Sequence, residues 1–175
     1  FLKGIMPACN ETGINMAIHP DDPPWDMFGL PRIITGEASY DKLFSAVSDV
    51  HNGITFCTGS LGAGRDNDLP KMVKKYASRI YFAHIRQLKY RGQYDFSEAG
   101  HRTADGDLNI FDIVKALIQS GFKGYVRPDH GRNIWGEDGK PGYGLYDRAL
   151  GAAYLNGLFE AVENYEIKNE ERKGI

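Results

Sequence analysis

Four side chains of the kinds that bind transition metals each stand at the end of a short apolar run in this sequence. They are His19, Cys57, His84 and Asp129, which close the runs NMAIH, GITFC, RIYFAH and GYVRPD. Imidazole, thiolate and carboxylate groups are protein ligands of divalent ions such as Zn²⁺, Fe²⁺ and Mn²⁺. Taken singly, each residue has an ordinary explanation, such as a buried cysteine, a core or turn histidine, or an aspartate that caps a loop. Four of them at one topological position favour a shared metal site.

These apolar runs are predicted to be β-strands that alternate with segments of helical period. The predicted strands are residues 15–19, 53–57, 79–85 and 124–129, and the predicted helices are residues 40–50, 68–76, 110–121 and 145–165. This alternation is typical of βα units that build a parallel sheet. Ligands gather at the carboxyl ends of parallel strands, and neighbouring strands lie about 4.8 Å apart, so the four side chains can converge on one ion.

Four βα units are half of what a closed (β/α)₈ TIM barrel contains, and such barrels typically have about 250 residues. The chain has 175 residues and opens at Phe1, within a segment of helical character. We therefore expect residues 1–175 to be the carboxy-terminal half of a single metal-dependent α/β barrel domain, without its amino-terminal half. An open doubly wound sheet is the alternative, but LGAG after the second strand falls short of the phosphate loop G-x-G-x-x-G.

The composition narrows the classes of partner. The chain is 42% hydrophobic and 25% charged, with a net charge of −2 and no block of Lys or Arg, which argues against nucleic acid and anionic lipid. No apolar run reaches the roughly 18 residues that a membrane-spanning helix needs. Two cysteines are too few for a disulfide scaffold, so we expect reduced thiols and a cytoplasmic location. The expected partner is a small molecule, and the exposed edge of half a barrel also predicts a homo-oligomer.

Further polar side chains flank the predicted ligands. His130 follows Asp129 and can act as a general acid or base near neutral pH. Tyr143 is the candidate from the glycine-rich loop 130–146, which is long enough to cover the site and exclude water. The candidates for binding a substrate carboxylate or hydroxyl are Arg86, His101 and Arg127. The ordinary alternatives at these positions are a solvent-facing histidine and surface ion pairs.

Longer stretches of the sequence resemble mannonate dehydratase. The resemblance is carried by AIHPDDPPW, ITFCTGSLGAGRDND, FAHIRQLK, HRTADGDLNIFDIVKAL, GYVRPDHGRNIWGE and PGYGLYDRALGAAYLNGL. It runs across almost the whole chain, and RPDHGR together with HPDDPP is its most specific part. It implies a xylose-isomerase-like barrel and a Mn²⁺ ion, or a similar divalent metal such as Fe²⁺. It also implies the conversion of D-mannonate, a six-carbon sugar acid, to 2-keto-3-deoxy-D-gluconate and water in hexuronate (glucuronate) catabolism.

The same resemblance implies residue roles. It assigns the metal to the four residues that close the strands, and proton transfer to His130 and Tyr143, without deciding which of these two is acid and which is base. Ligand softness alone would favour Zn²⁺ or Fe²⁺ over Mn²⁺. Two alternatives stay open: a sugar isomerase or epimerase on the same barrel, and a metal-binding fragment without activity. Family members carry an amino-terminal half that this chain lacks, and with it further substrate contacts.

Overall fold

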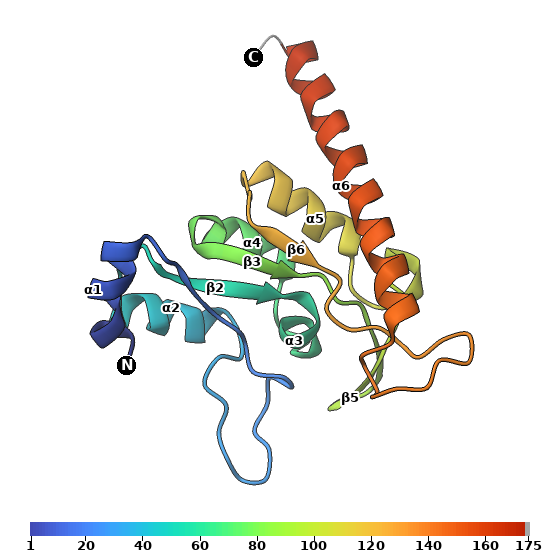
Figure 1. Cartoon of the computed structure of the whole chain (residues 1–175), viewed down its shortest axis with the longest axis horizontal. Helices are drawn as coiled ribbons and strands as arrows, with labels where there is room; N and C mark the ends of the chain where they lie inside the picture. Colours follow the sequence, from blue (N-terminus) through green and yellow to red (C-terminus); the bar gives the residue numbers. More distant parts are fainter. Residues whose placement is uncertain (174–175) are drawn as a thin grey trace.

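A computed structural model of the chain describes residues 1–173, with side chains up to residue 168, as an α/β fold built on a parallel sheet (Figure 1). The strands pair in the order β1 (Met16–Ile18), β2 (Asn52–Cys57), β3 (Ile80–His84) and β6 (Tyr125–Arg127). All three neighbouring pairs are parallel. The predicted parallel sheet is therefore confirmed at its four predicted positions, although three of the four strands are shorter than expected.

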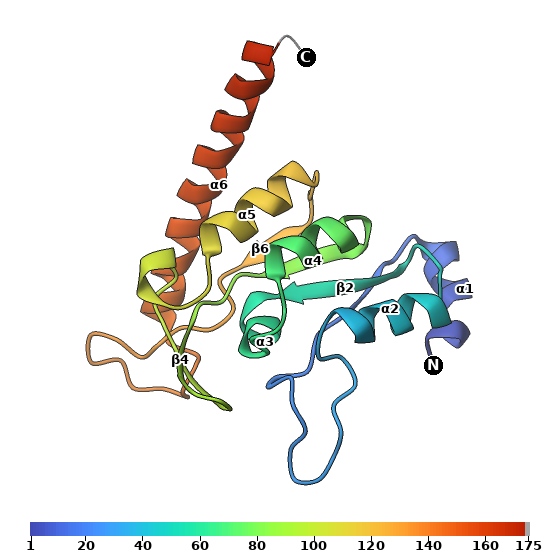
Figure 2. The same ribbon diagram turned by 180° about the vertical axis from the view of Figure 1, so that it is seen from behind.

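The helices are α1 (Leu2–Thr12), α2 (Glu37–Ala46), α3 (Thr58–Ala63), α4 (Leu69–Tyr76), α5 (Ile110–Gln119) and α6 (Leu145–Lys173), with 3₁₀ turns at Ala77–Arg79 and Thr103–Asp105. The second helix ends earlier than predicted because the backbone of Val47 is extended. The last helix runs past residue 165 and projects away from the sheet (Figures 1 and 2). Within residues 1–173, no helix combines the length and the apolar character needed to cross a membrane.

Two elements near the carboxyl end of the sheet were not predicted. Helix α3 follows β2 directly, and all six of its residues are buried. Strands β4 (Leu88–Gly92) and β5 (Asp95–Glu98) form an antiparallel hairpin after β3. The sequence TGSLGA has low intrinsic helix propensity because of its glycines, so tertiary packing must select the helix. Both elements lie beside the predicted site.

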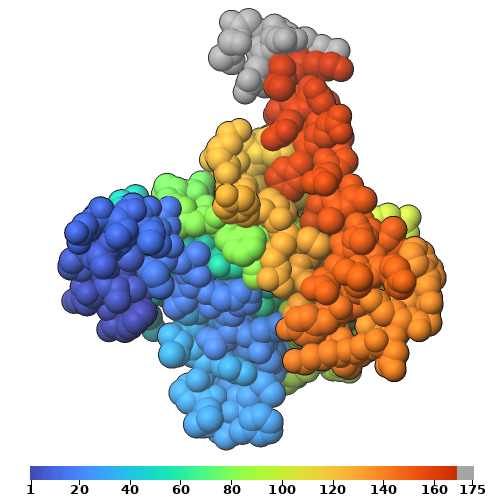
Figure 3. Space-filling model, in the orientation of Figure 1, coloured from blue at the N-terminus to red at the C-terminus, as the bar shows by residue number. Residues whose placement is uncertain are grey.

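The hydrophobic core lies on one face of the sheet. Alternate residues of a strand point to opposite faces, and Ile54, Phe56 and Ala83 are fully buried on the face covered by α4 and α5. In the view from behind, α2, α4 and α5 lie in front of the strands (Figure 2). On the opposite side, the middle of the chain is visible between the amino-terminal and carboxy-terminal segments (Figure 3). The sheet therefore has one face covered by helices and one that is more open.

The buried face of α5 gives a test of this packing. Leu117 is fully buried, whereas Phe111 on the same helix is 45% exposed. We expect Leu117→Ala to lower the free energy of unfolding by about 2–5 kcal/mol, because it removes buried apolar volume and leaves a cavity. Phe111→Ala should change it by less than about 1 kcal/mol. Urea unfolding of the intact protein measures both values, and equal losses would contradict the orientation of α5.

Candidate metal and proton-transfer site

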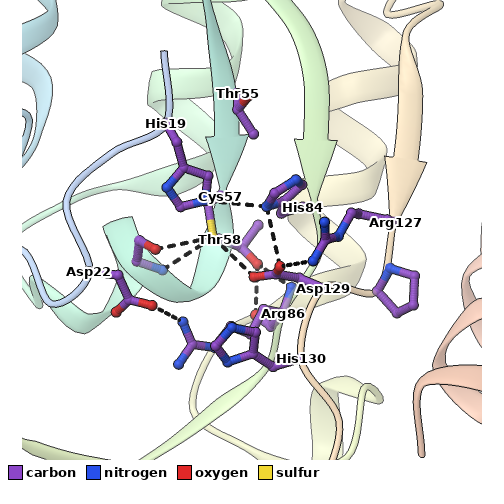
Figure 4. Close-up of polar contacts among 12 residues, drawn as sticks. His19, Asp22, Thr55, Cys57, Thr58, His84, Arg86, Arg127, Asp129 and His130 are labelled. Carbon is purple, nitrogen blue, oxygen red and sulfur yellow. Dashed lines mark hydrogen bonds and ion pairs between the residues drawn. The ribbon is translucent and has the colours of Figure 1, made fainter. Parts of the chain in front are cut away.

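The four predicted ligands meet at the carboxyl end of the sheet (Figure 4). His19 Nε2 lies 3.2 Å from His84 Nδ1, and Asp129 Oδ1 lies 3.3 Å from the same nitrogen. The Cys57 thiol donates a hydrogen bond of 3.5 Å to Asp129 Oδ2. One ligand atom from each of His19, Cys57 and His84 lies within 4.8 Å of the others, and Asp129 is not part of this three-residue set. The structure thus brings all four side chains together, while their role as ligands stays a prediction.

Strand register and one unusual backbone conformation produce this convergence. Cys57 and His84 are partners in the β2–β3 register, so their side chains leave the same face of the sheet. His19 lies one residue beyond β1. Asp129 was expected to end its strand, but β6 stops two residues earlier and Asp129 has a φ of 64°. A left-handed conformation is uncommon for a residue other than glycine, and here it accompanies a carboxylate directed at Cys57 and His84.

The geometry of this cluster fits a divalent cation. Ligand atoms bonded to one ion at about 2.0–2.3 Å lie about 3–3.7 Å apart. The contacts His19–His84, His84–Asp129 and Cys57–Asp129 fall in this range, and the two that involve Asp129 use its two different oxygens. The imidazole of His19 donates from Nδ1 to the carbonyl oxygen of Pro20 at 2.6 Å, which leaves Nε2 with its lone pair directed at His84. Metal-binding histidines commonly donate their second ring nitrogen in this way.

Burial determines the charge state of two of the predicted ligands. Burial raises the pKa of Cys57 to about 12, and the charge of Asp129 adds to the increase, while hydrogen bonds from Ser60 oppose it. Burial lowers the pKa of His84 to about 4 against the attraction of Asp129. Both groups are therefore neutral at neutral pH without a cation. A positive ion at this position would compensate a thiolate, and coordination deprotonates a cysteine.

Helix α3 holds the thiol in place. Cys57 is the N-cap of this helix, and its sulfur accepts hydrogen bonds from the Ser60 hydroxyl at 3.2 Å and the Ser60 backbone N–H at 3.5 Å. These two donors stabilise negative charge on the sulfur. Ser60 is a site residue that the sequence analysis missed, because helix α3 itself was not predicted.

His130 and Tyr143 lie together beside the cluster. Their ring centroids are 5.7 Å apart, and His130 Nδ1 lies 2.8 Å from Glu98 Oε1. Tyr143 is 47% exposed, and the cations of Lys140 and Arg148 lie 5.1 and 5.8 Å from its ring centroid. The predicted pair is thus adjacent, with its tyrosine open to solvent. Glu98 was not predicted, because it ends the unpredicted hairpin.

The three predicted substrate-binding residues have protein partners. The Arg86 side chain is only 4% exposed and bonds Glu98 and Asp22. His101 is 4% exposed, with Nε2 lying 2.9 Å from the carbonyl oxygen of Pro128. The half-exposed Arg127 donates to Asp129 Oδ1 at 2.7 Å (Figure 4). Each therefore supports the site, and direct contact with substrate stays a prediction for all three.

The two ends of the loop 130–146 are joined by backbone hydrogen bonds. Its ends pair through Gly131 N to Gly142 O at 3.0 Å and Gly144 N to Gly131 O at 2.9 Å. At the start of α6, the buried carboxylate of Asp147 accepts three hydrogen bonds from Arg132, one from the backbone and two from the guanidinium. These contacts tie the loop that carries Tyr143 to the last helix.

Removing the charge of Asp147 should therefore loosen this loop. Burial by itself would raise the pKa of Asp147, but the bonds from Arg132 outweigh it and the pKa lies below its ordinary value. We expect Asp147→Asn to lower the free energy of unfolding by about 1.5–3 kcal/mol at neutral pH. A depressed carboxyl pKa gives stability that is present above the unfolded-state pKa, about 3.9, and is lost as the pH falls through the folded-state pKa.

The difference in the free energy of unfolding between wild type and Asp147→Asn should therefore shrink below about pH 4. Urea unfolding at several pH values measures this difference. Asp138→Asn is the matched control, because Asp138 is exposed in the same loop. A difference that persists unchanged in acid would contradict the role of the Asp147 charge.

The chain is similar to proteins of one known family. The family model described as D-mannonate dehydratase (UxuA) matches residues 1–169. Mannonate dehydratase of Shouchella clausii (strain KSM-K16) is 53% identical over 173 residues, which cover 99% of this chain and 48% of that protein. Mannonate dehydratase 2 of Halalkalibacterium halodurans is 54% identical over 166 residues, 94% of this chain and 48% of that protein. The chain spans about half the length of the curated relatives it matches.

Solved structures agree with this relationship. The crystal structure of mannonate dehydratase from Streptococcus suis serotype 2 matches with a TM-score of 0.90 and 46% identity, over 95% of this chain and 48% of that one. The crystal structure of a D-tagatose 3-epimerase-like protein matches with a TM-score of 0.63 and 17% identity, over 95% of this chain and 54% of that one, and this likeness shows the fold alone. With a family model that extends over 169 residues and relatives above 50% identity, the chain belongs to the D-mannonate dehydratase family.

Proposed function

We propose that the protein is a metal-dependent hydro-lyase that converts D-mannonate to 2-keto-3-deoxy-D-gluconate and water in hexuronate breakdown. The observation that carries the proposal is the cluster of two imidazoles, one thiol and one carboxylate at the carboxyl ends of four strands. The adjacent His130–Tyr143 pair supplies groups for proton transfer. Relatives that are 53% and 54% identical to this chain over the aligned residues carry the name mannonate dehydratase.

The reaction needs two proton movements. The weakly acidic proton at C2, next to the carboxylate, must be removed, and the hydroxyl that leaves C3 must receive a proton. His130 Nε2 and Tyr143 Oη share these roles, because the other ring nitrogen of His130 is occupied by Glu98. The resulting enol becomes the 2-keto acid by tautomerisation.

The resident metal in this proposal is Mn²⁺. Fe²⁺ or another divalent ion is the alternative, and metal analysis of the purified protein distinguishes them. His19, Cys57, His84 and Asp129 would hold it. When bound, such an ion supplies Lewis-acid stabilisation of negative charge that develops beside the substrate carboxylate. Cys57 must stay reduced to serve as a ligand, which a cytoplasmic location provides. Both cysteines in the chain are free thiols.

The proposal includes a closed barrel of which this sheet is the carboxy-terminal half. The sheet has β1 and β6 as its edge strands, and Tyr125 on β6 is 85% exposed. Further strands at these edges would cover such surface. A mass of the intact protein near twice the 19.5 kDa of this chain is the expected result, and a mass of 19.5 kDa would contradict it. The expected homo-oligomer stays a prediction, which light scattering tests.

The function is tested by incubating the intact protein and Mn²⁺ with D-mannonate. We expect a 2-keto acid to form with release of water, and formation to stop when the metal is removed by chelation. Aldoses are the control substrates, because a sugar isomerase would convert them to ketoses. Ketose formation without keto-acid formation, or tight metal binding without any turnover, would contradict the proposal.

A further inference from the structure

Arg86 is the centre of a buried ionic network beside His130. Its Nε lies 3.0 Å from Glu98 Oε2, and one terminal nitrogen lies 2.6 Å from Glu98 Oε1. The other terminal nitrogen lies 2.5 Å from Asp22 Oδ2. A Cβ at Gly59 would collide with the Arg86 side chain, so the arginine lies tightly against α3. One guanidinium therefore connects the segments that follow β1 and β3 with the end of β5.

Glu98 connects this network to His130. Its Oε1 atom accepts from both Arg86 and His130 Nδ1. Burial alone would raise the pKa of Glu98, but the hydrogen bonds from His130 and Arg86 outweigh burial and hold the pKa below its ordinary value. An ionised carboxylate only accepts hydrogen bonds, so His130 Nδ1 carries the hydrogen. In the neutral ring, Nε2 then has the free lone pair.

The hairpin that carries Glu98 is itself well anchored. Trp25 packs against Tyr94 and Phe96, with ring centroids 5.3 and 6.0 Å away. At the other strand of the hairpin, the Asp107 carboxylate accepts from the backbone N–H of Tyr90 at 2.7 Å. The position of the Glu98 carboxylate is therefore set from both sides of the hairpin.

We propose that Glu98 is a positioning residue for His130, which fixes the ring orientation and the tautomer that leave Nε2 free to exchange a proton with the substrate. The inference rests on the proposed function and deepens it. Arg86, which the sequence suggested as a substrate-binding residue, acts here by holding Glu98 through two parallel hydrogen bonds. Removal of a carboxylate that supports a metal-binding histidine typically costs about 10–100-fold, and we expect an effect of similar size for the carboxylate that supports His130.

The kinetic test is Glu98→Gln in the intact, metal-loaded enzyme. Glutamine keeps the shape of the side chain but removes its charge and presents either oxygen or nitrogen to His130. We expect kcat for mannonate dehydration to fall about 10–100-fold, with KM and metal content within about twofold of wild type. Asp107→Asn is the matched control, because it loosens the same hairpin without touching His130. An equal loss in the control, or a raised KM with unchanged kcat, would overturn the proposal.

A double variant and a spectroscopic measurement separate positioning from other effects. If Glu98 acts through His130, Glu98→Gln should cause no further loss of kcat in a His130→Asn background, whereas a fully multiplicative loss would overturn the proposal. Nitrogen NMR of histidine-labelled protein loaded with diamagnetic Zn²⁺ should show hydrogen at Nδ1 of His130 in wild type and a changed tautomer ratio in Glu98→Gln. Hydrogen at Nε2 in wild type would be contrary evidence. NMR needs no turnover, so it tests the positioning role of Glu98 separately from the proposed function. If His130 carried hydrogen at Nδ1 in a protein that leaves mannonate unchanged, the proposed dehydratase activity would be refuted but the role of Glu98 would not.

Discussion

Cys57→Ser is expected to weaken divalent-metal binding by at least about 100-fold and to abolish dehydration of mannonate with it. Removal of a supporting partner already costs about 10–100-fold, and here a direct ligand is replaced. A serine hydroxyl is a poorer ligand than a thiolate because it stays protonated at neutral pH. The Ser60 donors, which now face a sulfur that can become negative, would face a neutral oxygen. Metal titration followed by calorimetry, and a keto-acid assay at saturating Mn²⁺, measure the two effects.

Cys9→Ser is the matched control for this experiment. Cys9 is also a buried free thiol, but it lies on α1, away from the carboxyl ends of the strands. Any general cost of placing a hydroxyl in a buried thiol position should appear in both variants. Metal affinity within about twofold of wild type is expected for Cys9→Ser. If Cys57→Ser bound Mn²⁺ as tightly as Cys9→Ser does, Cys57 would not be a ligand.

Much of the fold could be predicted from the sequence because its strands are continuous apolar runs. Such runs are typical of parallel strands that are buried on both faces, and all six residues of β2 are buried. Each run here ends in a side chain of a metal-binding type. The ends of β2 and β3 differ from the predicted ends by no more than one residue, and their register places Cys57 opposite His84. A ligand cluster could therefore be inferred from strand ends alone.

The parts of the site that lie between strands could not be predicted in this way. Helix α3 depends on tertiary contacts, such as the close packing of Gly62 against Leu108, and not on local propensity. Glu98 reaches His130 only because a hairpin folds back over the end of the sheet. Arg86 illustrates the consequence: its residue type suggested substrate binding, which stays a prediction, whereas its two carboxylate partners within the protein could not be foreseen.

His130→Asn is expected to lower kcat for mannonate dehydration by about 10²–10⁴-fold while metal affinity stays unchanged. General acid or base groups typically contribute this much, and an amide cannot exchange a proton near neutral pH. His130 Nδ1 faces Glu98 and not the four-ligand cluster, so its loss leaves the metal site intact. Single-turnover kinetics with metal-saturated protein separate this chemical effect from slower substrate binding.

The contrast between His130→Asn and Cys57→Ser separates the two kinds of role. His51→Asn provides the control, because the His51 ring lies near the opposite end of the strands, where its Nδ1 is 2.7 Å from Asn15 Oδ1. The kcat of this variant should stay within about twofold of wild type. If His130→Asn lost metal as Cys57→Ser is expected to, His130 would be a ligand and proton transfer would need another donor. If His130→Asn kept both its metal and full turnover, Tyr143 alone would have to serve both proton steps. If a Tyr143→Phe variant also stayed active, the assignment of proton transfer to His130 and Tyr143 would be refuted.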